Sequence, residues 1–314
     1  MVSPDKNQST TVMFIRLGFS EYPELQVTLF LLFLSLYVVN VAGNVGMIMV
    51  IMINRKLDTP MYFFLKHLSV VDFCYSTTIT HKLLENLVVE DRSISINICI
   101  TQFSFAVTFV MTEMVMLAVM AYDRFVAICY PLLYTIYMTP QRCALLVTVA
   151  YTWGVIPSTT LIYSILILSF CETKIIDKFV CEYNLFLSPS CSDKHFSEII
   201  LFIVVNLNAF CTLIIILTSY LFIFATILKM HSASGRNKAF STCTSHLMAV
   251  TIFYGSIFFL YCIPNSKNSL LILKVGSVFH TVVIPMANPF IYSLRNNDVK
   301  ETFRKIMDLK IISQ

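Results

Sequence analysis

The residues of this chain with the most chemical potential are carboxylates that stand inside long apolar runs. Asp72 and Glu113 each lie within such a run, and Asp123 is followed directly by Arg124 near the end of the run that holds Glu113. An ionised side chain in apolar surroundings is costly, so residues of this kind are usually paired and functional. No nucleophile, general base and oxyanion-binding group are grouped around these acids, which disfavours catalysis.

The dipeptide Asp123-Arg124 can work as an electrostatic switch. A guanidinium at the edge of an apolar phase needs a partner, and the adjacent carboxylate can neutralise it in one state. In a second state, the backbone carbonyl groups of a partner can accept its hydrogen bonds. The alternative is an arginine that simply extends from a helix end toward water, and the dipeptide alone does not decide between the two.

Composition indicates that membrane-spanning helices position these residues. The 314 residues are 57% hydrophobic and 13% charged, whereas a soluble domain has about 25% charged residues. A helix crosses a bilayer in about 20 residues, and the sequence has seven apolar runs of that size without the strict alternation of barrel strands. The predicted fold is therefore an all-α, seven-transmembrane helix bundle with runs at 27–53, 61–84, 96–129, 144–170, 199–228, 239–264 and 270–294.

The distribution of charge predicts the orientation of the bundle. The loops after the first, third and fifth runs, the chain end and the adjoining run ends with Lys66, Asp123 and Arg124 carry thirteen basic and five acidic residues, a net charge of +8. The opposite side carries nine basic and eleven acidic residues, a net charge of −2. Because basic residues concentrate in cytoplasmic loops, the amino terminus is expected outside the cell.

The predicted organisation has three parts: an extracellular amino terminus (1–26), the bundle (27–294) and a cytoplasmic tail (295–314). No cleavable signal peptide is recognisable at the start, and Asn7 begins a glycosylation acceptor sequence. The tail places apolar residues on one helical face between basic residues, which predicts an amphipathic helix on the inner leaflet. A disordered tail is the alternative.

The ten cysteines fall into two groups. Six lie in or beside apolar runs, where cysteine usually acts as a small buried hydrophobe. The other four lie near a helix end or in one polar loop, where they can pair in an oxidising compartment. Four cysteines allow three pairings, and these four are Cys99, Cys171, Cys181 and Cys191.

Four sequence strings are more specific than composition. PMYFFL (60–65) opens the second run, MAYDRFVAIC (120–129) closes the third, KAFSTCTSHL (238–247) opens the sixth and PMANPFIYSLRN (285–296) closes the seventh. The dipeptides Gly43-Asn44 in the first run and Ser219-Tyr220 in the fifth belong to the same set of characteristic strings. Together they resemble the odorant (olfactory) receptors, a family of rhodopsin-like G-protein-coupled receptors, over nearly the whole chain and in the right order.

The resemblance implies a plasma-membrane receptor, not an enzyme, that binds small volatile odorants and activates a stimulatory, cyclic-AMP-raising G protein. Its partners are then an odorant, a heterotrimeric G protein and the lipid bilayer, with no nucleic acid. A receptor of the same superfamily for another small ligand is the first alternative. An ion transporter is a more distant one, because such proteins often contain inverted repeats and no repeat relates the two halves of this sequence.

The resemblance also implies roles for particular residues. It joins Cys99 to Cys181 and Cys171 to Cys191, which would hold the long loop over a ligand pocket. It makes a polar cluster of Asn44, Asp72, Glu113 and Asn288 that holds a sodium ion or a proton, with no other cofactor. The implied activation switch comprises Asp123, Arg124, Tyr220, His246, Asn288, Pro289 and Tyr292, although His246 could also be an ordinary packed histidine.

The implied ligand pocket lies in the outer half of the bundle. Ala106 stands at the third-helix position where amine receptors hold an acid, so neutral ligands of modest polarity are expected, hydrogen-bonded by Asn208, Tyr261 or Thr281. Lys274 near the rim could attract a carboxylate, or it could extend toward water. The expected lining is Phe103, Ala106, Val107, Val110, Met111, Val205, Asn208, Tyr254, Ile257, Phe258, Tyr261, Val278 and Thr281.

Overall fold

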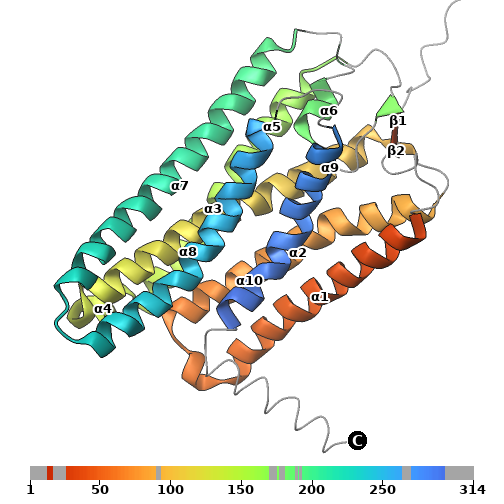
Figure 1. Cartoon of the computed structure of the whole chain (residues 1–314). Helices are drawn as coiled ribbons and strands as arrows, with labels where there is room; N and C mark the ends of the chain where they lie inside the picture. The colour runs from red at the N-terminus through yellow and green to blue at the C-terminus, as the bar shows by residue number, and fades with distance from the viewer. Residues whose placement is uncertain are drawn as a thin grey trace, which may run out of the picture.

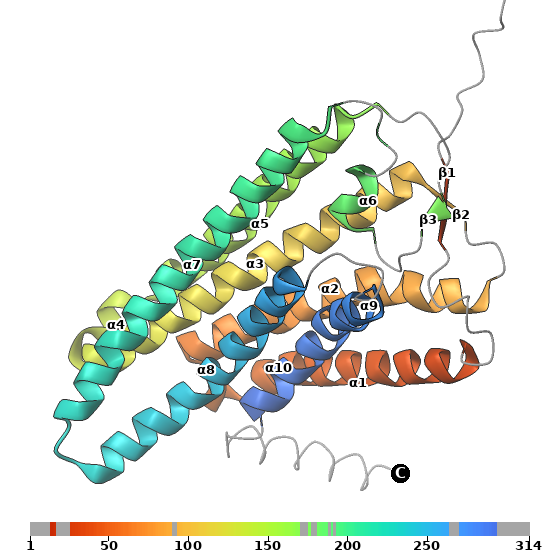
Figure 2. The same ribbon diagram turned by 45° about the horizontal axis from the view of Figure 1, so that its top comes forward.

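A computed structural model describes residues 13–16, 26–89, 93–169, 175–176, 181–187, 190, 193–263 and 270–293, a few of them by their backbone only. The described chain forms an elongated bundle of long helices (Figures 1 and 2). These are α1 (Gln26–Ile53), α2 (Pro60–Val88), α3 (Ile96–Cys129), α5 (Pro140–Leu166), α7 (His195–Lys229) and α8 (Ala233–Cys262). We call each of these long helices a rod. The seventh and last rod is made of three consecutive segments, α9 (Leu270–Val278), the π-helical segment η5 (Phe279–Val283) and α10 (Ile284–Ser293). The predicted seven-helix bundle is confirmed.

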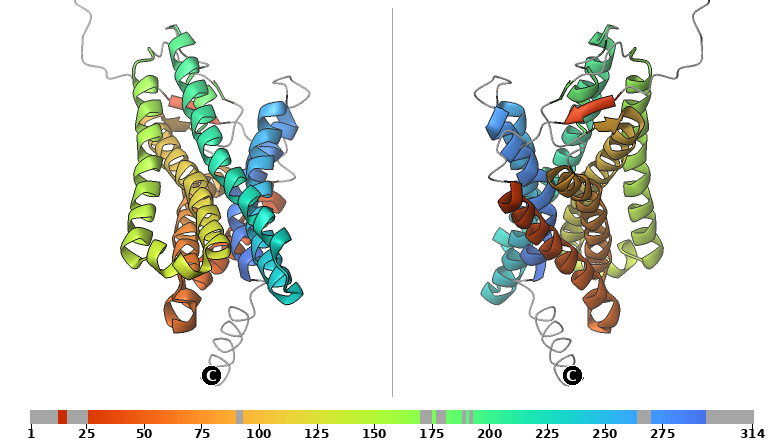
Figure 3. Two further views of the ribbon diagram at one scale, coloured as in Figure 1. Left: turned by 90° about the vertical axis from the view of Figure 1, so that its left-hand side faces the viewer. Right: turned by 90° about the vertical axis from the view of Figure 1, so that its right-hand side faces the viewer.

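Short elements connect the rods. The connection between α3 and α5 contains η3 (Pro131–Leu133) and α4 (Tyr134–Tyr137), η2 (Arg55–Leu57) precedes α2, and α6 (Tyr183–Leu187) precedes α7. Strand β1 (Met13–Arg16) pairs antiparallel with β2 (Ser93–Ser95) and parallel with β3 (Ile175–Ile176). This small sheet was not expected from the sequence, because strands of two to four residues are too short to show periodicity. It lies at the end of the bundle away from the α7–α8 connection (Figure 3).

The outward-facing side chains explain why the bundle needs lipid. Large apolar residues are exposed along the rods, such as Phe202, Leu221 and Phe222 on α7, which water would solvate poorly. Six of the described helices are long and apolar enough to cross a membrane. Helix α2 is the seventh and is more polar, because Lys66 and Asp72 lie within it.

Helix α3 is the central rod and packs against α2, α5 and α7. Its contact with α5 depends on small residues, as is common between membrane helices. A Cβ atom at Gly154 would lie 2.6 Å from the carbonyl oxygen of Thr108, so only glycine allows this approach. Ser158 Oγ on α5 also donates a hydrogen bond of 2.9 Å to the Ser104 carbonyl.

The π-helical segment η5 lies next to a proline. Pro285 has no backbone N–H, so the carbonyl four residues earlier has no α-helical donor there. Just before the proline, the N–H of Ile284 donates to the Phe279 carbonyl, five residues back. The extra residue in this turn brings His280 and Thr281, which are 8% and 7% exposed, into the interior of the bundle, and π-helical turns often occur at functional sites.

Candidate functional site

A cavity of about 270 Å³ lies inside one end of the bundle, bounded by α2, α3, α5, α7, α8 and the last rod. We call this the disulfide end, because the bond between Cys99 and Cys181 closes it. The 17 lining residues are mostly apolar, which suits a small organic ligand. They are Tyr75, Ile79, Phe103, Ala106, Val107, Val110, Met111, Leu161, Cys181, Glu182, Tyr183, Leu201, Val205, Leu260, Ser277, His280 and Thr281.

The structure brings seven of the residues expected in the pocket together around this cavity. Five of them share one face of α3, at a spacing of three to four residues, as a helical face requires. One comes from α7 and one from η5, on the other sides of the cavity. They are Phe103, Ala106, Val107, Val110, Met111, Val205 and Thr281.

Two expected polar residues lie outside the lining and are bonded elsewhere. Asn208 Oδ1 accepts a hydrogen bond of 3.0 Å from Trp153 Nε1. Tyr254 donates a hydrogen bond of 2.7 Å to Thr212 Oγ1 on α7. Both side chains therefore connect helices and do not line this cavity.

Three expected apolar residues also lie outside the lining. Phe258 is 71% exposed and points away from the bundle, whereas its neighbour Ile257 packs into the core. Adjacent residues on a helix point in directions about 100° apart, so one of this pair can face the core while the other faces outward. Val278 packs beside α1 and α2. The side chains of Tyr261 and Lys274 lie outside the described part of the chain.

The cavity has a polar edge that the sequence analysis missed. Glu182, Ser277 and His280 all line it, and Ser277 Oγ donates a hydrogen bond of 3.3 Å to Glu182 Oε1. The lining thus contains a carboxylate, although not at the α3 position, where Ala106 stands as expected. Glu182 could have been predicted to lie at the cavity from the sequence, because it directly follows Cys181, the cysteine expected to bond to the third helix.

The predicted disulfide between Cys99 and Cys181 is present. It ties the loop before α6 to the first turn of α3, and both cysteines are buried. Tyr183 beside it donates a hydrogen bond of 3.0 Å to the Ser197 carbonyl of α7, and the Phe186 ring packs on Phe103 at 5.8 Å. The loop is therefore fixed over the cavity. Cys171 and Cys191, the glycosylation acceptor Asn7 and the tail after residue 293 lie outside the described residues.

The opposite end, which we call the Arg124 end, places Asp123 and Arg124 differently from the predicted pair. Asp123 Oδ1 accepts a hydrogen bond of 2.9 Å from Tyr134, and no ion pair joins Asp123 to Arg124. Arg124 is 7% exposed, and among the described residues its Nε has no hydrogen-bond partner. The acid is thus held by the α3–α5 connection rather than by the adjacent guanidinium.

His246 bonds to two other helices close to this end. Its Nε2 lies 3.1 Å from the Leu117 carbonyl of α3, which can only accept, so Nε2 donates. In a neutral ring Nδ1 then accepts the hydrogen bond of 2.8 Å from Tyr220 of α7. The Tyr292 hydroxyl has no hydrogen-bond partner among the described residues. The two expected tyrosines therefore do not bond to each other in this structure, and Pro289 lies within α10.

Three of the four residues expected in the polar cluster meet in the middle of the bundle. Asn288 Nδ2 donates to Asp72 Oδ2 at 2.9 Å and to Glu113 Oε1 at 3.2 Å, and all three residues are at most 3% exposed. Asn44 instead donates to the Asn40 side chain at 2.5 Å and to the Pro285 carbonyl at 3.1 Å. The fourth expected member, Asn44, therefore bonds within α1 and to Pro285.

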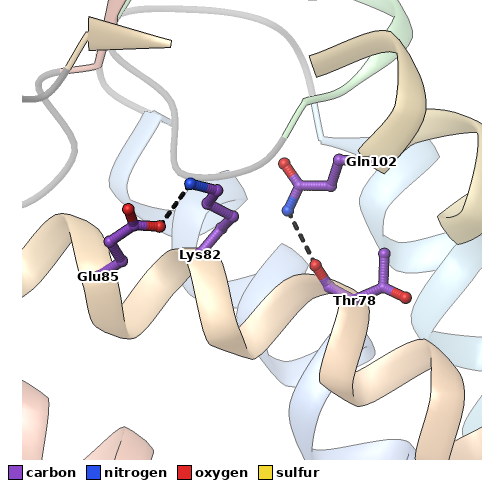
Figure 4. A network of polar contacts seen from close by, with 4 residues as sticks. All are labelled: Thr78, Lys82, Glu85 and Gln102. Atoms are coloured by element: carbon purple, nitrogen blue, oxygen red, sulfur yellow. Dashed lines mark hydrogen bonds and ion pairs between the residues drawn. The ribbon is translucent and has the colours of Figure 1, made fainter. Parts of the chain in front are cut away.

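Two other hollows open toward the outside of the bundle. One lies between α2 and α3, where Lys82 forms an ion pair of 2.5 Å with Glu85 and Gln102 donates to the Thr78 carbonyl at 3.1 Å (Figure 4). The other lies between α8 and α9 and is lined by exposed apolar side chains. Neither lies among the helices under the disulfide, so the first cavity is the candidate site.

An apolar cavity under a tethered loop, joined by one central helix to a buried arginine at the far end, defines a membrane receptor of the seven-helix class. Sequence comparisons identify the family within that class. The olfactory receptor family matches residues 33–310, and the chain belongs to this family of rhodopsin-like G-protein-coupled receptors.

Individual relatives match along their whole length. The chain is 58% identical to human olfactory receptor 5D13 over 312 residues, which are 99% of each chain. It is 59% identical to human olfactory receptor 5D18 over 313 residues, which cover both chains completely. It is 57% identical to mouse olfactory receptor 1165 over 305 residues, or 97% of this chain and 96% of that one.

Proposed function

We propose that this protein is an odorant receptor that binds small, mostly neutral volatile molecules in the cavity at the disulfide end. The largely apolar lining of this cavity, beneath the loop that the disulfide holds, is the observation that carries the proposal. About 270 Å³ accommodates only a small ligand, and ligands of about ten heavy atoms bind at micromolar concentration or more weakly. Like its relatives, the protein acts as a receptor rather than as an enzyme.

The Arg124 end activates a stimulatory G protein that raises cyclic AMP. Cys99 and Arg124 lie 25 positions apart on α3, which is about 38 Å along a straight helix. Ligand and G protein therefore bind at opposite ends of one rod, and coupling requires α7, α8 and the last rod to move relative to α3.

The charge distribution supports a plasma-membrane location with the disulfide end outside. The net charge of +8 belongs to the Arg124 end, helix ends included, and the net charge of −2 belongs to the disulfide end. A disulfide also forms where conditions are oxidising. Residues 1–26 are then extracellular, 27–294 form the receptor bundle and 295–314 form a cytoplasmic amphipathic tail.

Filling the cavity tests the ligand site. The substitution Val110→Trp places an indole among the lining side chains and is expected to reduce agonist potency about tenfold or more, because the indole occupies space that the ligand needs; tenfold corresponds to about 1.4 kcal/mol of binding free energy. The measurement is a cyclic-AMP response to a panel of volatiles in cells that express the receptor, normalised to surface staining. The matched control is Val155→Trp, since Val155 on α5 is 48% exposed. An unchanged potency in Val110→Trp would place the ligand elsewhere.

Asp72, Glu113 and Asn288 form the site for a sodium ion or a proton. Carboxylate oxygens suit a hard cation, and Asp72 Oδ1 has no hydrogen-bond partner among the described residues. We expect the melting temperature of the purified receptor to rise with sodium chloride but not with choline chloride, because an ion that binds only the folded state stabilises it. Glu113→Gln is expected to remove this dependence. A melting temperature indifferent to sodium in the unmodified receptor would assign a shared proton instead.

A further inference from the structure

We propose that the edge of the cavity formed by Glu182, Ser277 and His280 selects ligands that donate a hydrogen bond. Alcohols and phenols would bind better than ethers of the same shape, which only accept. The inference rests on the proposed function of the cavity as a ligand site and adds the chemical class of the ligand.

The three residues reach the same edge for separate structural reasons. Glu182 directly follows Cys181, which is bonded to α3. Ser277 and His280 are three residues apart across the α9–η5 junction and so share one face. Ser277 donates its hydroxyl proton to Glu182 Oε1. A carboxylate can accept several hydrogen bonds at once, so Glu182 can also accept one from a ligand.

The hydrogen bonds around His280 indicate which ring nitrogen carries the proton. Ser256 Oγ donates to the Phe253 carbonyl at 2.7 Å and lies 2.8 Å from His280 Nδ1. A hydroxyl has one proton, so Ser256 accepts from Nδ1–H. In the neutral ring Nε2 is then an acceptor, and His280 lines the cavity.

The other hydroxyl groups of the lining do not offset the excess of hydrogen-bond acceptors at this edge. Thr281 donates its proton to the Ser277 carbonyl of its own rod at 2.9 Å, and Tyr183 donates to the Ser197 carbonyl. Tyr75 can donate or accept, so it accommodates a ligand oxygen of either kind. The groups that discriminate are therefore the acceptors Glu182 and His280.

An ether oxygen at this edge faces two groups that can only accept, so the ether forms no hydrogen bond with them and gives up those it made with water. An alcohol or phenol supplies a proton that either group can accept. We expect the hydroxyl compound to bind about ten- to a hundredfold more tightly than its methyl ether.

The test uses the purified full-length receptor in lipid nanodiscs and two pairs of probes, 4-ethylphenol with 4-ethylanisole and 1-octanol with heptyl methyl ether. Binding is measured by ligand-observed NMR, which needs no G protein. Glu182→Gln and His280→Phe are each expected to reduce the preference for the hydroxyl probe at least threefold. The matched controls are Glu198→Gln and His81→Phe, exposed residues outside the lining, which are expected to keep it.

Three results would overturn the inference: ethers that bind as well as their hydroxyl partners, a preference unchanged in both cavity variants, or no binding of either probe at millimolar concentration. Glu182→Gln preserves side-chain shape, so it keeps the test decisive if His280→Phe fails to fold. Selective binding without a cyclic-AMP response would contradict the proposed coupling and leave the inference intact. A cyclic-AMP response with the same ligand preference in the Glu182 and His280 variants as in the unmodified receptor would contradict the inference and leave the proposed coupling intact.

Discussion

Replacement of Arg124 by alanine is expected to abolish the agonist-evoked rise in cyclic AMP while the receptor still reaches the cell surface. Signalling should be lost because the guanidinium is the group at this end that can donate to the carbonyl groups of a G protein. Surface delivery should persist because Arg124 has no ion pair with Asp123 to lose, and Asp123 keeps its hydrogen bond from Tyr134.

Arg142→Ala is the matched control for this experiment. Arg142 lies in the first turn of α5 at the same end of the bundle, but it is exposed and lies over the Tyr137 ring. The control removes the same charge, so a loss of response in Arg124→Ala alone isolates the role of the buried guanidinium. Surface staining and cyclic AMP are measured in the same cells. A full agonist response in Arg124→Ala would refute the switch, whereas loss of surface staining would show that Arg124 is needed for folding.

The sequence predicted the spans well because hydropathy reports the length of chain in contact with lipid. The predicted third span, 96–129, coincides with α3 (Ile96–Cys129), and Pro131 stands two residues after its end. Helix α5 begins at Pro140, four residues before the predicted run. Its first turn is polar and starts at Thr139, whose hydroxyl accepts from the Arg142 N–H. Hydropathy cannot detect such turns, which extend the helix beyond the bilayer.

Helix rotation explains which pocket residues could be predicted. The apolar stripe on α3 spans two turns and has one inward face, so the residues from Phe103 to Met111 were predicted together and line the cavity. In the second half of α8 apolar residues occur on all sides, so the pattern does not fix its rotation, and Phe258 proved to face outward. Glu182 was missed because a loop residue has no periodicity, and His280 because the π-helical segment shifts the face of the rod.

Asp123 shows a different limit of sequence-based reasoning. Adjacency in the sequence suggested Arg124 as its partner, yet consecutive helical residues point in directions about 100° apart. Tyr134 lies eleven positions further on and becomes the partner because α4 folds back against the end of α3. A contact created by a short connecting helix cannot be inferred from the spacing of the two residues.

Cys99→Ser and Cys181→Ser are each expected to prevent delivery of the receptor to the cell surface. Loss of a native disulfide commonly costs about 2–5 kcal/mol, a large part of the about 5–15 kcal/mol that stabilises a typical fold. The bond closes a separation of 82 residues, and it fixes Glu182 and Tyr183 over the cavity. Without it, the loop can leave the cavity and expose the apolar lining.

The double variant Cys99→Ser with Cys181→Ser gives the sharper measurement. Either single change already breaks the bond, so the double variant should lose no more surface staining than the more impaired single variant, a non-additivity that identifies two partners in one interaction. Cys211→Ser is the control, because Cys211 on α7 has a free thiol and should tolerate the change. Normal surface staining and agonist potency in both single variants would show that the disulfide is dispensable. Additive losses would show that the two cysteines contribute separately, as buried side chains rather than as a bond.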